Sequence, residues 1–203
     1  MTEQIQFYGD SISGNCYKLQ MAGAELGLDY VWHEMDILAG DTQTPKFLAL
    51  NSNGKVPLMI LADGRVLPES NAILSYLTDG SALAGTDRYA KANILQWLFF
   101  EQYSHEPVIA TSRFIMKYLN SPPSRQADLE AKQPGGYKAL SVMEQALGTQ
   151  EFIANNEYSI ADIALYAYTH VAHEGGFDLD DYPSVRRWLY RIEDRPRYVA
   201  MRS

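Results

Sequence analysis

Cysteine and long apolar segments are both scarce in this chain. Cys16 is the only cysteine among 203 residues, so no disulfide can form within the chain, and a secreted domain held together by disulfides is excluded. The sequence has no apolar run near its N-terminus and no stretch of about 20 apolar residues, the length that spans a bilayer. We therefore expect neither secretion nor membrane insertion, and we expect a cytoplasmic protein.

Positive charge is scarce as well. The formal net charge of −8 at pH 7 gives no general attraction to nucleic acid. His170 and His173 have a spacing that places two ligands on one face of a helix, but no third metal ligand lies near them in the sequence. Internal repeats and glycine motifs for phosphate binding are also lacking. We expect no nucleic-acid, membrane or metal partner.

Composition and pattern predict two packed domains. With 46% hydrophobic residues, the chain can form a substantial core, and domains of about 80 and 120 residues are ordinary in size. Strand-like runs stop at Asp79-Gly80-Ser81, and longer helical patterns follow. We expect an α/β domain at residues 1–80 and an all-helical domain at residues 86–203.

The sequence of the first domain predicts strands and helices in the order βαβαββα. Short apolar runs predict strands, and helical periodicity predicts helices. The strands are expected at Ile5–Tyr8, Tyr30–Glu34, Leu58–Leu61 and Val66–Leu67, the last two as a hairpin, and the helices at Cys16–Leu26, Pro45–Leu50 and from Glu69 onward. In the second domain, helices are expected at Asp87–Tyr118, Ala127–Leu147, Ile160–His173 and Pro183–Asp194.

Two local signals refine the helical domain. Pro107 lies inside the first of its helices and should bend or interrupt it, because proline lacks the N–H that a helix interior needs. Ser159 and Asp162 stand three residues apart before an apolar run, which is the pattern of a capping box. We expect Asp162 to contribute to stability and not to chemistry.

The segment Asn53-Gly54-Lys55-Val56-Pro57 predicts a site for an extended ligand. Gly54 permits a tight turn, while Pro57 keeps Val56 out of helix and favours a cis bond. A cis bond would leave the Val56 N–H and C=O facing outward, free to pair with a ligand as an added strand would. Lys55 adds a positive charge, and a solvated surface lysine is the equal alternative.

A helix start follows at Pro68-Glu69-Ser70. Backbone N–H groups at such a start bind a carboxylate, and the Glu69 side chain can bind an ammonium. Helix capping alone also explains both residues, and the two roles are compatible. The segments around Val56 and Glu69 together predict a small peptide-like ligand that carries both charges.

A second helix start lies at Ser13-Gly14-Asn15-Cys16. It places a hydroxyl, an amide and a thiol at the positive end of a helix dipole, where a thiolate is stabilised. The thiolate belongs either to Cys16 or to the ligand. Ser13 as a plain helix cap and Cys16 as a small buried hydrophobic residue are the structural alternatives.

These three segments, in this order and spacing, resemble the cytosolic glutathione S-transferase superfamily along essentially the whole chain. The resemblance implies a thioredoxin-like domain followed by a helical domain, glutathione as co-substrate, attack of its thiolate on a small hydrophobic electrophile, a role in detoxification, and a homodimer. It also implies that Ser13 donates to the glutathione sulfur, with Asn15 as a second donor. Some bacterial members carry a cysteine at the position of Cys16.

The resemblance assigns further residues. Thr42 and Gln43 lie where relatives contact the glycine carboxylate, although the usual basic residue is missing and Lys55 is the substitute. Val56, Pro57, Glu69 and Ser70 hold the rest of glutathione. Tyr8 lies slightly too early to be the hydroxyl of the tyrosine-type members and is interpreted as packing. Candidates for the electrophile site are Trp97 and Phe100, and above all Tyr103, His105 and Arg113.

Two other functions stay open. Cys16 forming a mixed disulfide with glutathione would give a glutathione-dependent disulfide reductase. Some members of the superfamily keep the fold as binding or regulatory proteins, and the missing basic residue near Thr42 and Gln43 points in that direction. The sequence does not name the electrophile.

Overall fold

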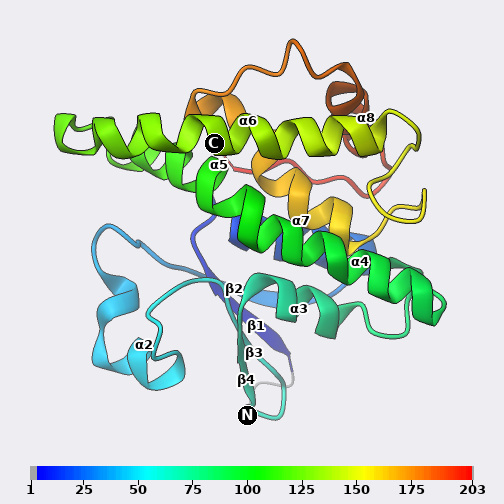
Figure 1. Ribbon diagram of the computed structural model, residues 1–203. Helices are drawn as coiled ribbons and strands as arrows, with labels where there is room; N and C mark the ends of the chain where they lie inside the picture. The colour runs from blue at the N-terminus through cyan, green and yellow to red at the C-terminus, as the bar shows by residue number, and fades with distance from the viewer. Residues whose placement is uncertain (1–3, 203) are drawn as a thin grey trace. The chain divides into compact units, whose positions relative to one another are not determined.

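The computed structural model describes residues 4–202 (Figure 1). The chain forms two compact units: the first runs to Asp79 and includes the segment from Arg197, and the second spans Gly80–Pro196. The segment from Arg197 was predicted as part of the helical domain. It groups with the first unit because the Tyr17 hydroxyl donates to the Val199 carbonyl at 2.5 Å and the Arg197 guanidinium donates to the Glu25 carbonyl.

The first unit has the predicted βαβαββα order. Its elements are β1 (Ile5–Gly9), α1 (Gly14–Leu26), β2 (Tyr30–Glu34), α2 (Pro45–Leu50), β3 (Leu58–Ile60), β4 (Val66–Pro68) and α3 (Ser70–Leu77). They form a four-stranded sheet with the order β2-β1-β3-β4. β1 and β2 are parallel, and the β1–β3 and β3–β4 pairs are antiparallel. The predicted hairpin is therefore present.

The core of this unit lies on one face of the sheet. Phe7 of β1 and Met59 of β3 are register partners and pack with Leu19 of α1 and Ile73 of α3, and all four side chains are buried. Apolar burial of this kind stabilises by about 1.5–3 kcal/mol for each large side chain. It fixes α1 and α3 against the same sheet, and so fixes the two helix starts that the sequence singled out.

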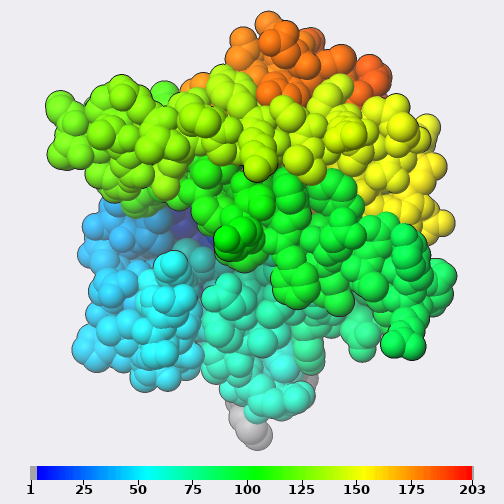
Figure 2. Space-filling view, viewed as in Figure 1, coloured from blue at the N-terminus to red at the C-terminus, as the bar shows by residue number. Residues whose placement is uncertain are grey.

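The second unit is helical. Its elements are α4 (Arg88–Phe100), α5 (Glu106–Arg113), α6 (Gln126–Leu147), α7 (Ile160–Thr169) and α8 (Pro183–Glu193). Every residue of α7 is buried, whereas α4 and α6 form much of this unit's surface in Figure 2. Among residues 4–202, no helix has the length and apolar character needed to cross a membrane.

The predicted helix Asp87–Tyr118 contains two wider turns. π-helical turns occupy Glu101–His105, between α4 and α5, and Phe114–Tyr118, after α5. Pro107 lies in the first turn of α5, where a missing N–H costs little. The predicted interruption near Pro107 is confirmed, and it takes the form of a π turn.

The predicted helix Ile160–His173 ends earlier, at Thr169, and a 3-10 turn at Ala172–Gly175 follows. Gly176 then adopts a left-handed conformation with φ of 80°, which ends helical structure. The capping box of α7 is present as predicted. The Ser159 hydroxyl accepts from the Ala161 N–H at 3.3 Å, and the Asp162 carboxylate accepts from the Ser159 N–H at 2.9 Å.

Candidate functional site

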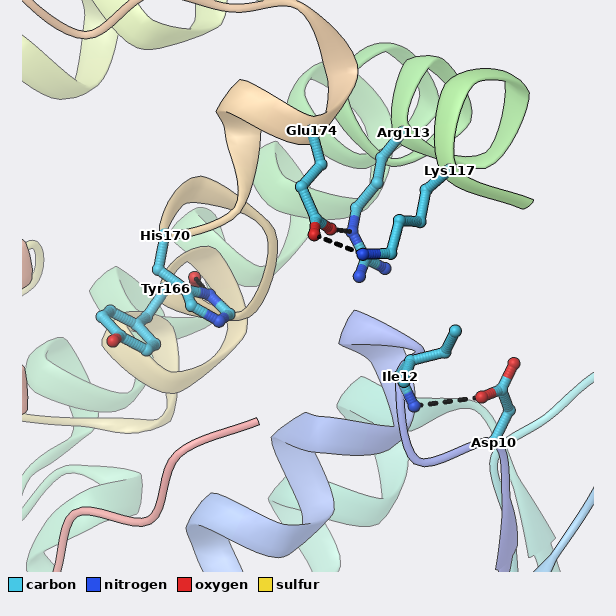
Figure 3. A network of polar contacts seen from close by, with 7 residues as sticks. All are labelled: Asp10, Ile12, Arg113, Lys117, Tyr166, His170 and Glu174. Atoms are coloured by element: carbon cyan, nitrogen blue, oxygen red, sulfur yellow. Dashed lines mark hydrogen bonds and ion pairs between the residues drawn. The ribbon is translucent and has the colours of Figure 1, made fainter. Parts of the chain in front are cut away.

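The loop between β1 and α1 presents Ser13 at the start of the helix. Within the loop, the Ile12 N–H donates to Asp10 Oδ1 at 3.0 Å (Figure 3), and the Ser13 N–H donates to the Asp10 carbonyl at 3.0 Å. Ser13 has extended backbone angles and occupies the N-cap, yet its side chain makes no capping hydrogen bond. Its half-buried hydroxyl therefore lies at the positive end of the α1 dipole without serving the helix.

Cys16 is fully buried in the first turn of α1. Burial raises the pKa of its thiol to about 12, and the hydrogen bond with the Ser13 side chain lowers it only in part. A Cβ atom added to Gly9 would lie 3.0 Å from the Cys16 sulfur, so the thiol is packed tightly against β1. At neutral pH the thiol is protonated, and this environment favours the interpretation of Cys16 as a buried hydrophobic residue.

Glu34, at the end of β2, holds the same loop from the other side. Its carboxylate accepts from the Ser11 N–H at 2.7 Å and from the Trp32 indole N–H at 2.7 Å, and it also accepts from the Ser11 hydroxyl. Burial raises the Glu34 pKa, but the hydrogen bonds from Ser11 and Trp32 outweigh that effect and hold the pKa below its usual value. An ionised Glu34 thus anchors the residues that precede Ser13.

The segment before β3 contains the predicted cis bond, between Val56 and Pro57. Gly54 has φ of 61°, a left-handed conformation that favours glycine, and an added Cβ would lie 2.6 Å from Gln43 Nε2. Asn51 Nδ2 donates to the Lys55 carbonyl at 2.8 Å. Within the described part of the chain, neither the N–H nor the C=O of Val56 has a hydrogen-bond partner. Both are therefore available to a ligand.

Thr42 and Gln43 support this segment. Gln43 Nε2 donates to the Gly54 carbonyl at 3.1 Å and to Thr42 Oγ1 at 3.2 Å. Thr42 is buried, whereas Lys55 is exposed. The Gln43 amide is engaged in hydrogen bonds with Gly54 and Thr42. The exposed cation of this region is Lys55.

The start of α3 carries a strained residue. Glu69 is its N-cap and has φ of 73° and ψ of 113°, a region that non-glycine residues rarely adopt. Its exposed carboxylate has no hydrogen bond or ion pair with any residue from 4 to 202. Strain of this kind costs about 1–3 kcal/mol and persists where the surrounding structure requires it.

A buried lysine links the two helix starts. Lys18 of α1 is fully buried, and its Nζ lies 3.3 Å from Ser70 Oγ and 3.2 Å from Asn71 Oδ1. The Ser70 hydroxyl in turn donates to Asn15 Oδ1 at 3.2 Å. The first unit therefore brings Asn15 and Ser70 together, and it adds the charge of Lys18 to the positive end of the α3 dipole.

The residues predicted for the electrophile site lie in the helical unit and differ in exposure. Tyr103 is 88% exposed. His105 is fully buried, with Nε2 2.9 Å from Thr169 Oγ1. Arg113 is also buried and pairs with Glu174 at 2.6 Å (Figure 3). Of the three, Tyr103 is the exposed side chain, whereas His105 and Arg113 are buried and contact Thr169 and Glu174.

The other residues considered in the sequence have packing roles. Trp97 is buried and packs edge-on against Phe100, and Tyr8 stacks on His33. The His170 ring stacks on Tyr166 with centroids 4.6 Å apart (Figure 3), and burial lowers the His170 pKa to about 4. Among residues 4–202, no group of three or more His, Cys, Asp or Glu side chains is arranged to hold a metal ion.

Sequence reasoning missed three residues of this region, namely Lys18, Glu34 and Asn51. Asn51 carries a local signal, because an asparagine before Ser52-Asn53-Gly54 is a turn residue. Lys18 and Glu34 carry none, since Lys18 acts on Ser70 and Glu34 acts on Ser11, each more than twenty residues away in the chain.

Comparison with known proteins agrees with this arrangement. The family model "Glutathione S-transferase, N-terminal domain" matches residues 12–79, and "Glutathione S-transferase, C-terminal domain" matches residues 96–196. A solved glutathione S-transferase from Pseudomonas fluorescens is 52% identical, with 98% of each chain covered and a TM-score of 0.95. A solved possible glutathione S-transferase from Rhodopseudomonas palustris is 45% identical, with the same coverage and a TM-score of 0.94.

Among curated proteins, the disulfide-bond oxidoreductase YfcG of Escherichia coli is 29% identical over 189 residues, which are 90% of this chain and 87% of YfcG. The two family models fall on the α/β unit and on the helical unit in turn. The helix starts at Ser13 and Ser70 and the Val56–Pro57 step all lie within the first of these matches. This chain is a member of the glutathione S-transferase superfamily.

Proposed function

We propose that this protein is a glutathione transferase that uses Ser13 to activate the glutathione thiol. The observation that carries the proposal is the Ser13 hydroxyl, which occupies a helix N-cap without capping the helix. A hydroxyl placed at the positive end of a dipole is suited to donate to a thiolate. Family membership supplies glutathione as the thiol.

The groups that would bind glutathione match its charges. The open N–H and C=O of Val56 pair with the tripeptide backbone as a neighbouring strand would. A glutathione carboxylate lies at the N-terminal N–H groups of α3, near Ser70 and the buried Lys18, and the ammonium pairs with the Glu69 carboxylate. The strained backbone at Glu69 directs the Glu69 carboxylate toward the ligand, and this role accounts for the strain.

The remaining contacts concern the second carboxylate and the sulfur. Lys55 is the exposed cation for the second carboxylate, and Thr42 and Gln43 act by holding the Gly54 turn that presents Val56. Asn15 is the second donor near the sulfur. Its Oδ1 accepts from Ser70, and the NH₂ group of the same side chain is the donor in this proposal.

The chemistry is thiolate attack. The Ser13 hydroxyl donates to the sulfur, the thiol proton leaves to solvent, and the sulfur lone pair forms a carbon–sulfur bond as the electrophile loses its leaving group or opens its ring. Lowering the thiol pKa by about two units corresponds to about 2.7 kcal/mol of thiolate stabilisation. One or two directed donors and a helix dipole can supply this amount.

On the electrophile side, we propose a contact from Tyr103, the exposed member of the predicted set. His105 and Arg113 act through the packing of the helical unit. Exposed apolar side chains on the same helical stretch, Leu95 and Phe99, suit a buried surface in a homodimer. A cytoplasmic setting and a role in detoxification complete the proposal.

The test combines calorimetry of glutathione binding with ultraviolet detection of bound thiolate across pH, for the parent and Ser13→Ala. We expect both to bind, with thiolate appearing at lower pH in the parent. If both bind and titrate alike, Ser13 does not activate the thiol. If the parent binds glutathione but turns over none of a broad set of electrophiles, the protein is a binding protein.

Disulfide reduction with glutathione is the second candidate, and the similarity to the E. coli oxidoreductase favours it. In this reaction glutathione thiolate attacks a disulfide to form a mixed disulfide, and a second glutathione then releases the reduced substrate and glutathione disulfide. The buried Cys16 thiol, with its pKa raised to about 12, is poorly suited to attack. Cys16→Ala should therefore keep any reductase activity, and loss of that activity alone would assign the chemistry to Cys16.

A further inference from the structure

Glu34 ends β2 beside the loop that carries Ser13. Gly9 and Glu34 are register partners at the ends of the parallel strands β1 and β2, and the Met35 N–H donates to the Gly9 carbonyl at 3.0 Å. The loop of residues 10–13 follows this pair directly. The sheet therefore fixes the backbone of Glu34 at the point where the loop begins.

Both oxygens of the Glu34 carboxylate contact Ser11. Oε1 accepts from the Ser11 N–H at 2.7 Å, and Oε2 accepts from the Ser11 hydroxyl. Oε2 also accepts from the Trp32 indole N–H at 2.7 Å. A carboxylate accepts at both oxygens, whereas an amide of the same shape accepts at one and would turn its NH₂ group toward donors. The contact therefore requires a carboxylate, and glutamine would satisfy it only in part.

Packing of the Trp32 indole fixes the orientation of this carboxylate. A Cβ added to Gly9 would lie 2.8 Å from the Trp32 ring and 3.0 Å from the Cys16 sulfur. The ring and the sulfur thus both pack at the last residue of β1, and the indole N–H is held in place to donate to Glu34. The carboxylate that binds Ser11 is therefore itself bound to a packed side chain.

The loop depends on this contact for its attachment to β2. Its own hydrogen bonds run from the Ile12 N–H to Asp10 Oδ1 and from the Ser13 N–H to the Asp10 carbonyl, both at 3.0 Å. They shape the turn, and Glu34 ties the turn to the sheet through Ser11. Ser13 makes no side-chain cap with the backbone of α1, so the placement of its hydroxyl depends on the backbone of the loop.

We propose that Glu34 is a positioning residue for thiol activation. Through Ser11 it holds the loop so that the Ser13 hydroxyl stays at the start of α1 and donates to the sulfur. This role rests on the proposed function of Ser13 and extends it to a side chain that acts through the loop and not on the sulfur itself.

The charge of Glu34 acts in the opposite sense. Negative charge disfavours a nearby thiolate, and the charges of Asp10 and Glu34 both raise the pKa of the Cys16 thiol. Arg202 is the cation whose charge lowers the Glu34 pKa. Positioning and charge therefore predict opposite results when Glu34 is neutralised: lost positioning makes a bound thiol less acidic, and lost charge alone makes it more acidic.

Ultraviolet titration of glutathione thiolate on the parent and on Glu34→Gln tests this role. Lost positioning should raise the pH at which thiolate appears by about 1, a tenfold change in the ionisation constant. Calorimetry should show glutathione affinity within about twofold of the parent. Ser11→Ala removes one donor and keeps the Glu34 charge, so it should shift the titration in the same direction by a smaller amount. Asp29→Asn, at an exposed position of the same unit, is the control for one lost negative charge and should titrate like the parent.

The same titration in a Ser13→Ala background shows whether Glu34 acts through Ser13. If it does, Glu34→Gln should not raise the pH of thiolate formation further in that background, and an equal rise in both backgrounds would overturn the role. Thermal melting checks that each variant is folded. If Glu34→Gln titrates like the parent or at lower pH while Ser13→Ala shifts the titration upward, the positioning role is wrong and the proposed function stands. If Ser13→Ala itself titrates like the parent, the proposed function is wrong, and the role of Glu34 falls with it.

Discussion

Two α-helices of the described chain, α1 and α7, begin with a serine at the N-cap, and the two serines are used differently. At α7, the Ser159 hydroxyl accepts from the Ala161 N–H and donates to Asp162, and all of these groups are buried. At α1, the Ser13 side chain makes no capping bond and is half-buried. The same residue type at the same helical position therefore caps the helix in one unit and leaves it without a side-chain cap in the other.

The neighbours of each serine sharpen the contrast. Asp162 closes the capping box and also accepts from the Ile153 N–H and the Trp188 indole, both at distances below 3 Å. No carboxylate occupies the matching place at α1, where the third residue of the helix is Cys16. A helix start without its box is a weaker cap and a better anion site. Side-chain use, and not residue type, separates a structural cap from a binding group.

The largest expected effect belongs to the structural cap. Asp162→Ala removes the acceptor of three buried N–H donors, those of Ile153, Ser159 and Trp188. Leaving buried donors unsatisfied costs about 1–3 kcal/mol each, so the free energy of unfolding should fall by at least about 3 kcal/mol. Urea unfolding measures the change. A loss below about 1 kcal/mol would show that solvent or neighbouring groups satisfy these donors.

The pH dependence of stability should reflect the titration of Asp162 as well. Burial raises the Asp162 pKa to about 6, although its hydrogen bonds with Ile153, Trp188 and Ser159 lower it. The folded state then binds more protons than the unfolded state between about pH 4 and pH 6. The part of the stability that is linked to protonation of Asp162 is therefore fully present below about pH 4 and is lost as pH rises through about 6.

Because a difference of one in pKa corresponds to about 1.4 kcal/mol, this change is at most about 3 kcal/mol. The measurement is the difference in the free energy of unfolding between the parent and Asp162→Asn, from pH 7 to pH 4, since other titrating groups cancel in it. The difference should shift in favour of the parent as pH falls. A constant difference, or a shift in favour of the variant, would mean that the hydrogen bonds outweigh burial.

Much of the fold was predictable because its signals are local. Short apolar runs bounded by Gly and Pro gave the βαβαββα order, and Ser159 with Asp162 gave the capping box. The π turn at Glu101–His105 was not predictable in form, since Pro107 indicates an interruption but not its geometry. The contacts of the segment from Arg197 with Tyr17 and Glu25 were not predictable, because they join opposite ends of the chain.

The candidate site divides in the same way. Ser13, Gly54, Pro57 and Ser70 stand in short motifs whose chemistry can be read in sequence. Lys18 resembles any helical lysine, and Glu34 any residue at a strand end, until the fold brings each to its partners. Burial was equally hidden, since Tyr103 and His105 are two residues apart in sequence, yet one is exposed and the other is fully buried.

Measurements of activity and stability should distinguish Ser13 from Ser159. Ser13→Ala should lower kcat/KM for glutathione conjugation about a hundredfold, the equivalent of about 2.7 kcal/mol, with little change in stability because no capping bond is lost. Ser159→Ala is the matched control and should lower stability by about 1 kcal/mol while leaving the kcat/KM of the folded protein unchanged. Both are measured by steady-state kinetics and urea unfolding. The reverse pattern would show that Ser13 is the structural cap.

The smallest expected effect concerns the charge behind the α3 start. Lys18 Nζ contacts Ser70 Oγ and Asn71 Oδ1, so it reinforces the end of α3 that is proposed to hold a carboxylate. Lys18→Met keeps much of the buried apolar stem and removes the charge. Glutathione affinity should fall about tenfold, the effect of one charge-assisted hydrogen bond or less.

Calorimetry of glutathione binding measures this change, with Lys46→Met as the control, because Lys46 is exposed on α2 of the same unit. The comparison of the two helix starts adds a second readout. If Lys18 acts on the carboxylate at α3 and not on the sulfur, the pH at which bound thiolate appears should be the same in Lys18→Met and the parent. If the thiolate titration shifts and the glutathione affinity does not change, Lys18 instead acts at the start of α1, through the Asn15–Ser70 hydrogen bond. The starts of α1 and α3 would then be electrostatically coupled.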